Sequence, residues 1–320
     1  MANSLTNYYY FTEAGNQFGL GHLKRYEAIS QMLPEITIEL VLYNKSDTNF
    51  CDNFWDNDNK DKIKKYISSS QAIFVDTFVA DEEVFKIFET ANKLVVIDDY
   101  IRRPWEKGLI IDWTLDAEKW RENCGDISLF GIKYIATRKS FMCQEWDREV
   151  IKKKFIDWKI GTVFGGSDNL NLTDQIYSIL KNHKNVSHFG TKLYPSYKKY
   201  KDNNRFLWDL EESDFSKKIS SCDMVITAGG QMLYELARMG VPSICLSTND
   251  NQDEDFRAFS SNKLIIPFEF RELSSTKFIK KINTLDYSNL LEINERCKFL
   301  FSNNNILGDE IKNYLCLYNI

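Results

Sequence analysis

The first half of the chain alternates short apolar segments with polar, helix-like ones. Five of the apolar segments are rich in β-branched and aromatic residues: 8–11, 36–43, 72–76, 93–99 and 109–112. Each predicts a buried strand, and residues 25–33, 61–68 and 81–92 predict the helices between them. Continuous apolar strands separated by helices are typical of a parallel sheet covered on both faces. The chain is therefore expected to be an α/β protein.

A second alternating series follows the charged residues 146–158. Its expected strands begin with the strand and turn of residues 161–166 and continue with residues 185–189, 205–208, 224–227 and 243–246. The tail beyond Ser274 predicts three helical pieces. A length of 320 residues favours two domains. We therefore predict an N-terminal αβ domain over residues 1–150 and a C-terminal αβ domain over residues 151–320, with parallel sheets that face a cleft.

Composition excludes several classes of protein. The chain has 46 acidic and 41 basic residues and a net charge of -5, so it carries no electrostatic footprint for nucleic acid. It contains no run of eighteen apolar residues, and its first residues do not form a signal peptide. The seven cysteines are scattered without Cys-x-x-Cys spacing, which favours reduced thiols in a cytoplasmic protein. No membrane span, nucleic acid, metal, other cofactor or obligatory protein partner is expected.

The turn at residues 19–25 (Gly-Leu-Gly-His-Leu-Lys-Arg) follows the first strand and opens the first helix. Gly19 and Gly21 allow a tight turn that brings free amides close to a ligand. His22 falls at the helix start, where the positive end of the dipole disfavours a protonated ring. A neutral imidazole beside an anion-binding turn is a candidate general base. The alternative is an ordinary helix-entry turn with a structural histidine.

A second glycine turn follows the strand at residues 224–227. Ala228-Gly229-Gly230 leads into a helix that begins near Gln231, and its free amides can hold a diphosphate. Glu235 lies one turn into this helix, where a carboxylate can accept both hydroxyls of a ribose. The alternative is an ordinary helix cap followed by a surface glutamate.

Further polar groups follow the predicted strands, at the edge where ligands bind in parallel sheets. They are Asp76, Asp98 and Asp99 in the first half, and Gly166, Ser167 and Asp168 in the second. Asn251 and Gln252 follow a later strand, and their amides suit a sugar or a base edge. For the residues of the second half, simple helix capping is the open alternative. His183 and His188 have no partners at metal-ligand spacing.

Several motifs in the same order resemble the UDP-sugar hydrolases of pseudaminic acid synthesis. These are relatives of the spore-coat polysaccharide proteins and share the two-domain (GT-B) fold of the peptidoglycan N-acetylglucosaminyl transferase. The resemblance covers nearly the whole chain. The motifs are residues 19–25, 97–99 with Arg103-Pro104, 134–138, 165–173, 228–230 with 234–236, 240–242 and 251–252.

The resemblance implies metal-independent attack of water on the anomeric carbon of a UDP-linked acetamido sugar. His22 matches the histidine regarded in the family as the catalytic base. The expected nucleotide-binding positions are Ala228, Gly229, Gly230, Gln231 and Glu235. The expected substrate-binding positions are Gly19, Gly21, Asp76, Asp99, Gly166, Ser167, Asn251 and Gln252.

Two positions depart from the family pattern. Phe11 stands where the family has an arginine ahead of the first acid of the opening loop, and Phe78 stands where it commonly has a tyrosine. Both changes are expected to make the acceptor side less polar. They favour a second hypothesis, a glycosyltransferase in which His22 deprotonates a sugar hydroxyl. A third hypothesis is a nucleotide-sugar binding protein without turnover.

Overall fold

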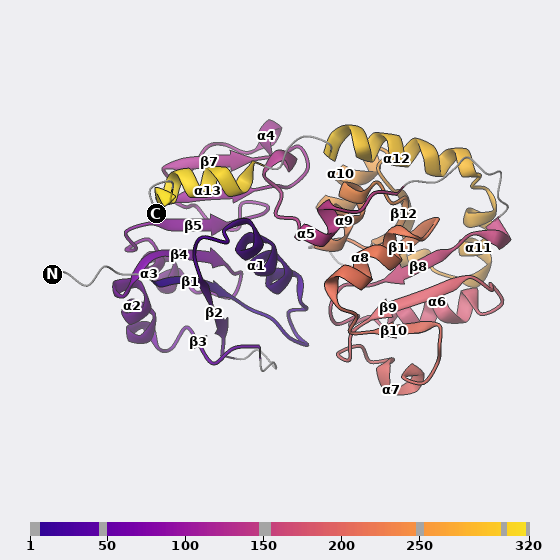
Figure 1. Ribbon diagram of the computed structural model, residues 1–320, viewed down its shortest axis with the longest axis horizontal. Coiled ribbons are helices and arrows are strands. Elements are labelled where there is room, and N and C mark those ends of the chain that lie inside the picture. The colour runs from indigo at the N-terminus through magenta and orange to yellow at the C-terminus, as the bar shows by residue number, and fades with distance from the viewer. Residues whose placement is uncertain (1–6, 45–49, 147–154, 248–252, 302–305, 318–320) are drawn as a thin grey trace. The chain divides into compact units, whose positions relative to one another are not determined.

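The computed structural model describes residues 7–44, 50–146, 155–247, 253–301 and 306–317 (Figure 1). It divides into two compact units: unit 1 comprises residues 1–138 and 304–320, and unit 2 comprises residues 139–303. The boundary between the units, after residue 138, thus lies earlier than residue 150, where the change in composition had predicted it. The helical tail is also shared between the units, whereas the sequence had assigned all of it to the second domain.

Unit 1 contains a parallel sheet of seven strands in the order β3-β2-β1-β4-β5-β6-β7. Its strands are β1 (Asn7–Thr12), β2 (Ile38–Tyr43), β3 (Phe54–Trp55), β4 (Ser70–Asp76), β5 (Leu94–Ile97), β6 (Leu109–Asp112) and β7 (Ile127–Phe130). Its helices are α1 (Gly21–Met32), α2 (Lys60–Ser68), α3 (Glu82–Phe88), α4 (Ala117–Trp120) and α13 (Leu307–Leu315). The five strands expected in this half are confirmed.

Helix α13 returns from the end of the chain to unit 1, and Figure 1 shows it in yellow beside β5 and β7. Lys93 Nζ donates to the carbonyl of Tyr314 over 2.9 Å, and the Tyr314 hydroxyl accepts from the amide of Leu94 over 3.3 Å. An ion pair of 2.6 Å joins Lys312 to Glu35. These contacts explain why the last helix belongs with the first domain, which composition alone could not indicate.

Aromatic side chains fill one face of the unit 1 sheet. Phe11, at the centre, is fully buried, with its ring centroid 5.0 Å from that of Phe88 and 6.3 Å from that of Trp55. Close edge-to-face packing of large rings removes much apolar area from water and fixes their positions. This packing holds the strands in fixed positions, and therefore also the residues that follow them at the carboxyl edge of the sheet.

Unit 2 contains a parallel sheet of six strands in the order β10-β9-β8-β11-β12-β13. Its strands are β8 (Ile160–Val163), β9 (Val186–Gly190), β10 (Phe206–Trp208), β11 (Met224–Ala228), β12 (Ser243–Ser247) and β13 (Ile266–Glu269). Its helices are α5 (Lys139–Met142), α6 (Leu172–Leu180), α7 (Tyr197–Tyr200), α8 (Glu212–Ser220), α9 (Gln231–Met239), α10 (Asp253–Ser261), α11 (Ser275–Asn283) and α12 (Tyr287–Phe301). Three tail helices, α11 to α13, match the prediction.

Three strands escaped the sequence analysis: β3, β7 and β13. All three lie at sheet edges. β3 has two residues, β7 is exposed at its start, and β13 contains Pro267. Edge strands tolerate polar residues and proline because one side of the ladder is unpaired. Such strands lack the continuous apolar signal that revealed the central ones.

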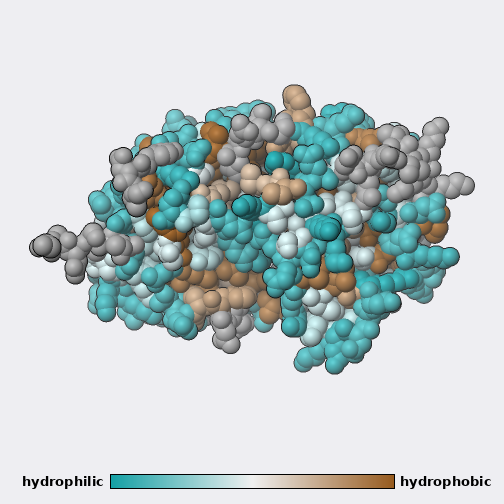
Figure 2. Space-filling view, in the orientation of Figure 1, coloured by the Kyte–Doolittle hydropathy of each residue, from teal (hydrophilic) through white to brown (hydrophobic). Residues whose placement is uncertain are grey.

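Hydrophilic residues cover most of the face seen in Figure 2, and hydrophobic residues occupy smaller areas of it. Within the described ranges of the chain, no helix is both long and apolar enough to cross a membrane.

Candidate functional site

The strand order of unit 1 reverses between β1 and β4, the place where parallel sheets bind ligands. Thr12 and Asp76, the last residues of these strands, are register partners, and the Thr12 hydroxyl donates to the carbonyl of Asp76 over 2.7 Å. Glu13 follows β1 directly. Two acidic side chains therefore stand on either side of the switch point.

His22 lies at this point, in the first turn of α1. Its Nδ1 is 2.8 Å from Oδ1 of Asp76, and the histidine is 8% exposed. The same carboxylate accepts from the hydroxyl of Tyr10 over 3.1 Å and from Arg25 over 3.2 Å. Burial opposes ionisation of Asp76, but His22 and Arg25 outweigh it and lower the pKa of that carboxyl. An ionised carboxylate only accepts, so Nδ1 carries a proton, and in the neutral form of the ring the lone pair is on Nε2.

The Nε2 side of the ring has two neighbours. Oε1 of Glu13 is 3.9 Å from Nε2, and the Phe78 ring lies with its centroid 5.5 Å from that of the imidazole. Phe78 is 46% exposed, and its backbone amide donates to Glu13 Oε1 over 3.0 Å. The atom of His22 that can take a proton therefore lies between a buried carboxylate and an accessible aromatic ring.

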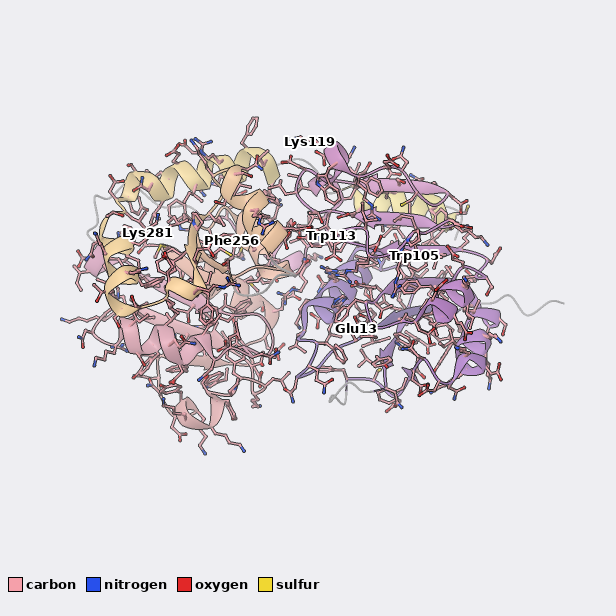
Figure 3. All side chains as sticks on the ribbon, turned by 180° about the vertical axis from the view of Figure 1, so that it is seen from behind. Glu13, Trp105, Trp113, Lys119, Phe256 and Lys281 are labelled. Atoms are coloured by element: carbon pink, nitrogen blue, oxygen red, sulfur yellow. The ribbon has the colours of Figure 1, made fainter. Side chains whose placement is uncertain are left out.

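Two arginines balance the carboxylates of this edge. Arg25 donates to Oδ2 of Asp99 over 2.6 Å, and Arg102 forms an ion pair with Oδ1 of the same side chain. Burial would raise the pKa of Asp99, but Arg25 and Arg102 more than reverse this and hold it well below its usual range. The Arg25 guanidinium also lies 5.2 Å from the ring centre of Trp113, which follows β6 (Figure 3). Asp99 thus holds the guanidinium groups of Arg25 and Arg102 in position.

A second charged cluster lies at the same edge of the sheet, where β5 and β6 end. Arg121 donates to Oδ2 of Asp98 and to Oδ2 of Asp112, each over 2.5 Å. All three side chains are at most 3% exposed. Burial raises the pKa of Asp98 to about 6, since Arg121 offsets only part of the desolvation. This cluster is an internal ion-pair network, in which the Arg102 amide and the Arg121 guanidinium take up the two oxygens of Asp98.

The loop before α1 is closed by its own glycines. Gly15 and Gly19 exchange two backbone hydrogen bonds of 2.9 and 2.7 Å, both with positive φ. Helix α1 begins at Gly21 without a side-chain cap, and a Cβ added at Gly21 would meet nothing within 4 Å. The space beside Gly21 is consequently open at the start of α1, where a ligand-binding turn needs room.

Unit 2 has an equivalent switch point between β8 and β11. Gly230 precedes α9 with φ 92° and ψ −165°, and no side chain caps the helix. Gln231 is 8% exposed and Glu235 is 1% exposed. The alternative interpretation of Glu235 as a surface glutamate is therefore wrong. Ala228 is the last residue of β11, and Gly229 and Gly230 lie between this strand and the start of α9.

The other loop at this switch point contains Gly166, Ser167 and Asp168. Asp168 accepts from the amides of Leu172 and Thr173 over 2.7 and 3.0 Å, so it caps α6. Burial raises the pKa of Asp168, and the amide and hydroxyl donors at Thr173 lower it by less. Ser167 is 7% exposed. Capping, the simpler of the two interpretations, accounts for Asp168.

Three further expectations have different outcomes. Asn251 and Gln252 lie outside the described residues. Phe11 is not at the site: its side chain packs in the aromatic core, so its replacement of an arginine removes no polar group beside His22. His183 accepts from the amide of Asn185 and bonds the carbonyl of Phe155, as a structural histidine does.

The sequence analysis did not assign Glu13, Arg25 or Arg102 to the site, although Glu13 is the acid of the opening loop and Arg25 belongs to the motif at residues 19–25. Arg25 is three residues after His22 and so shares its helix face, and Glu13 follows a strand, as Asp76 does. The sequence therefore contained a signal for Arg25 and one for Glu13. Within the part of the chain that the structure describes, no group of three or more His, Cys, Asp or Glu side chains could hold a metal ion.

Solved structures with the same fold are two-domain glycosyltransferases of the GT-B type. MurG of Acinetobacter baumannii superposes with a TM-score of 0.63 at 11% identity, covering 97% of this chain and 99% of that one. The spinosyn rhamnosyltransferase SpnG, complexed with thymidine diphosphate, gives a TM-score of 0.59 at 10% identity over 96% and 99% of the two chains. The fold is thus an α/β fold with two Rossmann-like parallel sheets, as predicted.

The relatives by sequence include a pseudaminic acid cytidylyltransferase and UDP-2,4-diacetamido-2,4,6-trideoxy-beta-L-altropyranose hydrolase of Helicobacter pylori. The chain is 26% identical to it over 250 residues, which are 76% of this chain and 44% of that protein. An uncharacterized protein of Methanocaldococcus jannaschii is 22% identical over 272 residues, 76% of this chain and 56% of that protein. The chain spans about half the length of these curated relatives. No protein-family model matches it. The resemblance indicated by the motifs is confirmed.

Proposed function

We propose that this protein processes a nucleotide-linked sugar, and that it hydrolyses a UDP-linked acetamido sugar at the anomeric carbon. The observation that carries the proposal is the Asp76–His22 pair at the switch point of unit 1, with Nδ1 held by a carboxylate over 2.8 Å. The similarity to the Helicobacter pylori hydrolase supports the choice of substrate and reaction.

In this proposal His22 acts as the general base. Asp76 orients the ring and stabilises the positive charge that forms when Nε2 accepts a proton. The attacking water loses that proton as its oxygen bonds to the anomeric carbon. The bond from this carbon to the diphosphate oxygen breaks, and UDP leaves with the electron pair.

Unit 2 is assigned the nucleotide. The leaving diphosphate needs stabilisation of its charge more than it needs a proton. The uncapped start of α9 after Gly229 and Gly230 offers amides and the positive end of a helix dipole for this purpose. Glu235, one turn further on, is assigned to the ribose hydroxyls.

Turnover without an acceptor tests the proposal. The protein is incubated with a panel of UDP-acetamido sugars, and free UDP and free sugar are quantified by anion-exchange chromatography. Hydrolysis predicts equal amounts of both in the absence of any acceptor. Release of UDP only after an acceptor is added would instead support glycosyl transfer.

Glycosyl transfer is the second candidate, and Phe78 is the observation that favours it. The ring lies beside His22 and is 46% exposed, where the hydrolase family commonly has a tyrosine. An apolar surface at that position suits an acceptor better than a lone water. Replacing Phe78 by tyrosine should then raise the ratio of hydrolysis to transfer.

A further inference from the structure

Glu13 is a buried carboxylate with one oxygen unused. The residue is 0% exposed, and its Oε1 accepts from the amide of Phe78 over 3.0 Å. Its Oε2 is buried and has no hydrogen-bond partner among the described residues. Buried polar atoms of folded proteins are nearly always paired. An unpaired carboxylate oxygen at the ligand-binding edge of a sheet indicates a partner supplied by the ligand.

The position of Glu13 relative to His22 indicates which partner this is. Oε1 of Glu13 is 3.9 Å from Nε2, too long for a direct hydrogen bond. A water oxygen placed about 2.8 Å from Nε2 and from a Glu13 oxygen donates one ordinary hydrogen bond to each. Because Asp76 occupies Nδ1, Nε2 is the atom that must accept a proton of that water.

We propose that Glu13 is a second carboxylate of the catalytic site, which orients the attacking water toward His22 and stabilises the imidazolium on the side opposite Asp76. The inference rests on the proposed function. The proton moves from the attacking oxygen to Nε2 while that oxygen bonds to the anomeric carbon, and UDP leaves with the electron pair. No further reactant is needed.

The charges around the ring fit this role. Asp76 approaches from the end of β4, Glu13 from the end of β1 and Arg25 from α1, while Asp99 and Arg102 follow β5. Burial raises the pKa of Glu13, and the charge of His22 and the donors at Thr77 and Phe78 offset only part of this. A carboxylate kept in a site that opposes its ionisation is characteristic of functional sites.

A purely structural role is the competing explanation, since Glu13 also anchors the Phe78 amide. Glu13→Gln separates the two, because the amide keeps an oxygen for Phe78 and removes the charge. Glu13→Asp is the second variant, since it keeps the charge. Glu27→Gln is the matched control: Glu27 lies on α1, is partly exposed and pairs with Lys24 over 2.7 Å.

Steady-state kinetics give the first measurement. Glu13→Gln should lower kcat about 100-fold, the lower end of the range for acid–base groups, with little change in KM. The acid limb of its rate profile should move to lower pH, because loss of a negative charge makes protonation of the ring less favourable. Glu13→Asp should keep the limb near its wild-type position, and Glu27→Gln should match wild type. An unchanged kcat in a folded Glu13→Gln protein overturns the proposal.

Titration of the histidine signals by NMR gives a second measurement that needs no turnover. The chain has three histidines, and His22→Asn identifies the signal of His22. Its titration midpoint should move to lower pH in Glu13→Gln and stay in place in Glu27→Gln; an unmoved midpoint in Glu13→Gln overturns the proposal. If the midpoint moves while no UDP-sugar is turned over, the proposed function fails and the coupling of Glu13 to His22 stands.

Discussion

The two sheets share a strand order but equip their switch points in opposite ways. At β1 and β4 of unit 1 the edge carries titratable side chains, with His22 2.8 Å from Asp76 and 3.9 Å from Glu13. At β8 and β11 of unit 2 it carries glycines and a helix start without a side-chain cap. A proton transfer needs titratable groups, whereas a diphosphate needs backbone amides that no side chain obstructs. One topology thus serves two kinds of chemistry.

The two edges are also stable for different reasons. Unit 1 must pair its buried aspartates, because an unpaired buried ion costs several kcal/mol, and Arg25 and Arg121 pair with Asp76 and Asp98. Unit 2 must keep the backbone before α9 in a conformation that only glycine adopts easily. Substitutions should therefore destabilise unit 1 by leaving buried charges unpaired, and unit 2 by straining the backbone.

His22→Asn should have the largest effect. Loss of the base should lower the rate of UDP release about 10²–10⁴-fold, while the UDP affinity measured by calorimetry stays the same, since unit 2 is assigned the nucleotide. An unchanged rate would remove His22 from the mechanism. A large loss of UDP affinity would contradict the division of labour between the units.

Arg25→Ala should destabilise the fold by about 3–5 kcal/mol, because it removes a buried guanidinium that pairs with both Asp76 and Asp99. Urea unfolding measures this. Arg296→Ala is the matched control: its ion pair with Glu292 on α12 is exposed, and its loss should cost about 0.5 kcal/mol or less. Equal effects of the two substitutions would show that the charged edge is not a stability requirement.

Asp98 should make unit 1 less stable as the pH rises. Its pKa is raised from 3.8 to about 6 by burial, so the folded state binds this proton more tightly than the unfolded state. The contribution to stability is full below pH 3.8 and is lost as the pH rises through 6, by about 3 kcal/mol. Asp98→Asn should remove that loss when urea unfolding is compared at pH 4 and pH 7. Asp61→Asn, at an almost fully exposed side chain, should leave the pH dependence unchanged.

Gly230→Ala should destabilise unit 2 by about 1–3 kcal/mol, because φ 92° with ψ −165° strains any residue with a Cβ. It should also weaken UDP binding, since the amides at the start of α9 would shift. Thermal unfolding and calorimetry measure the two effects.

Gly21→Ala is the contrasting variant in unit 1. Gly21 has ordinary helical geometry, and its added Cβ would meet nothing within 4 Å. Stability should stay the same or rise by up to about 1 kcal/mol. If KM for the UDP-sugar rises all the same, the open space beside Gly21 is occupied by substrate. An unchanged KM would remove Gly21 from the substrate site.

Much of the fold could be predicted from the sequence because the central strands are buried on both faces. Their continuous apolar runs identified five strands of each sheet, and the motifs around them identified the resemblance. Edge strands such as β7 and β13 lacked that signal. The placement of α13 could not be read either, since it depends on contacts of Tyr314 and Lys312 with residues more than two hundred positions away.

The sequence by itself determined that this is an α/β chain with two glycine turns, one of them followed by His22. Only the tertiary structure decided what surrounds that turn. Parallel register brings Asp76 to the Nδ1 side of the ring, and Glu13 lies toward the Nε2 side. The tertiary structure also places Phe11 in the core, because alternate residues of a strand point to opposite faces of the sheet. Local patterns encode elements, whereas the partners of a buried charge are set by which strand ends lie side by side.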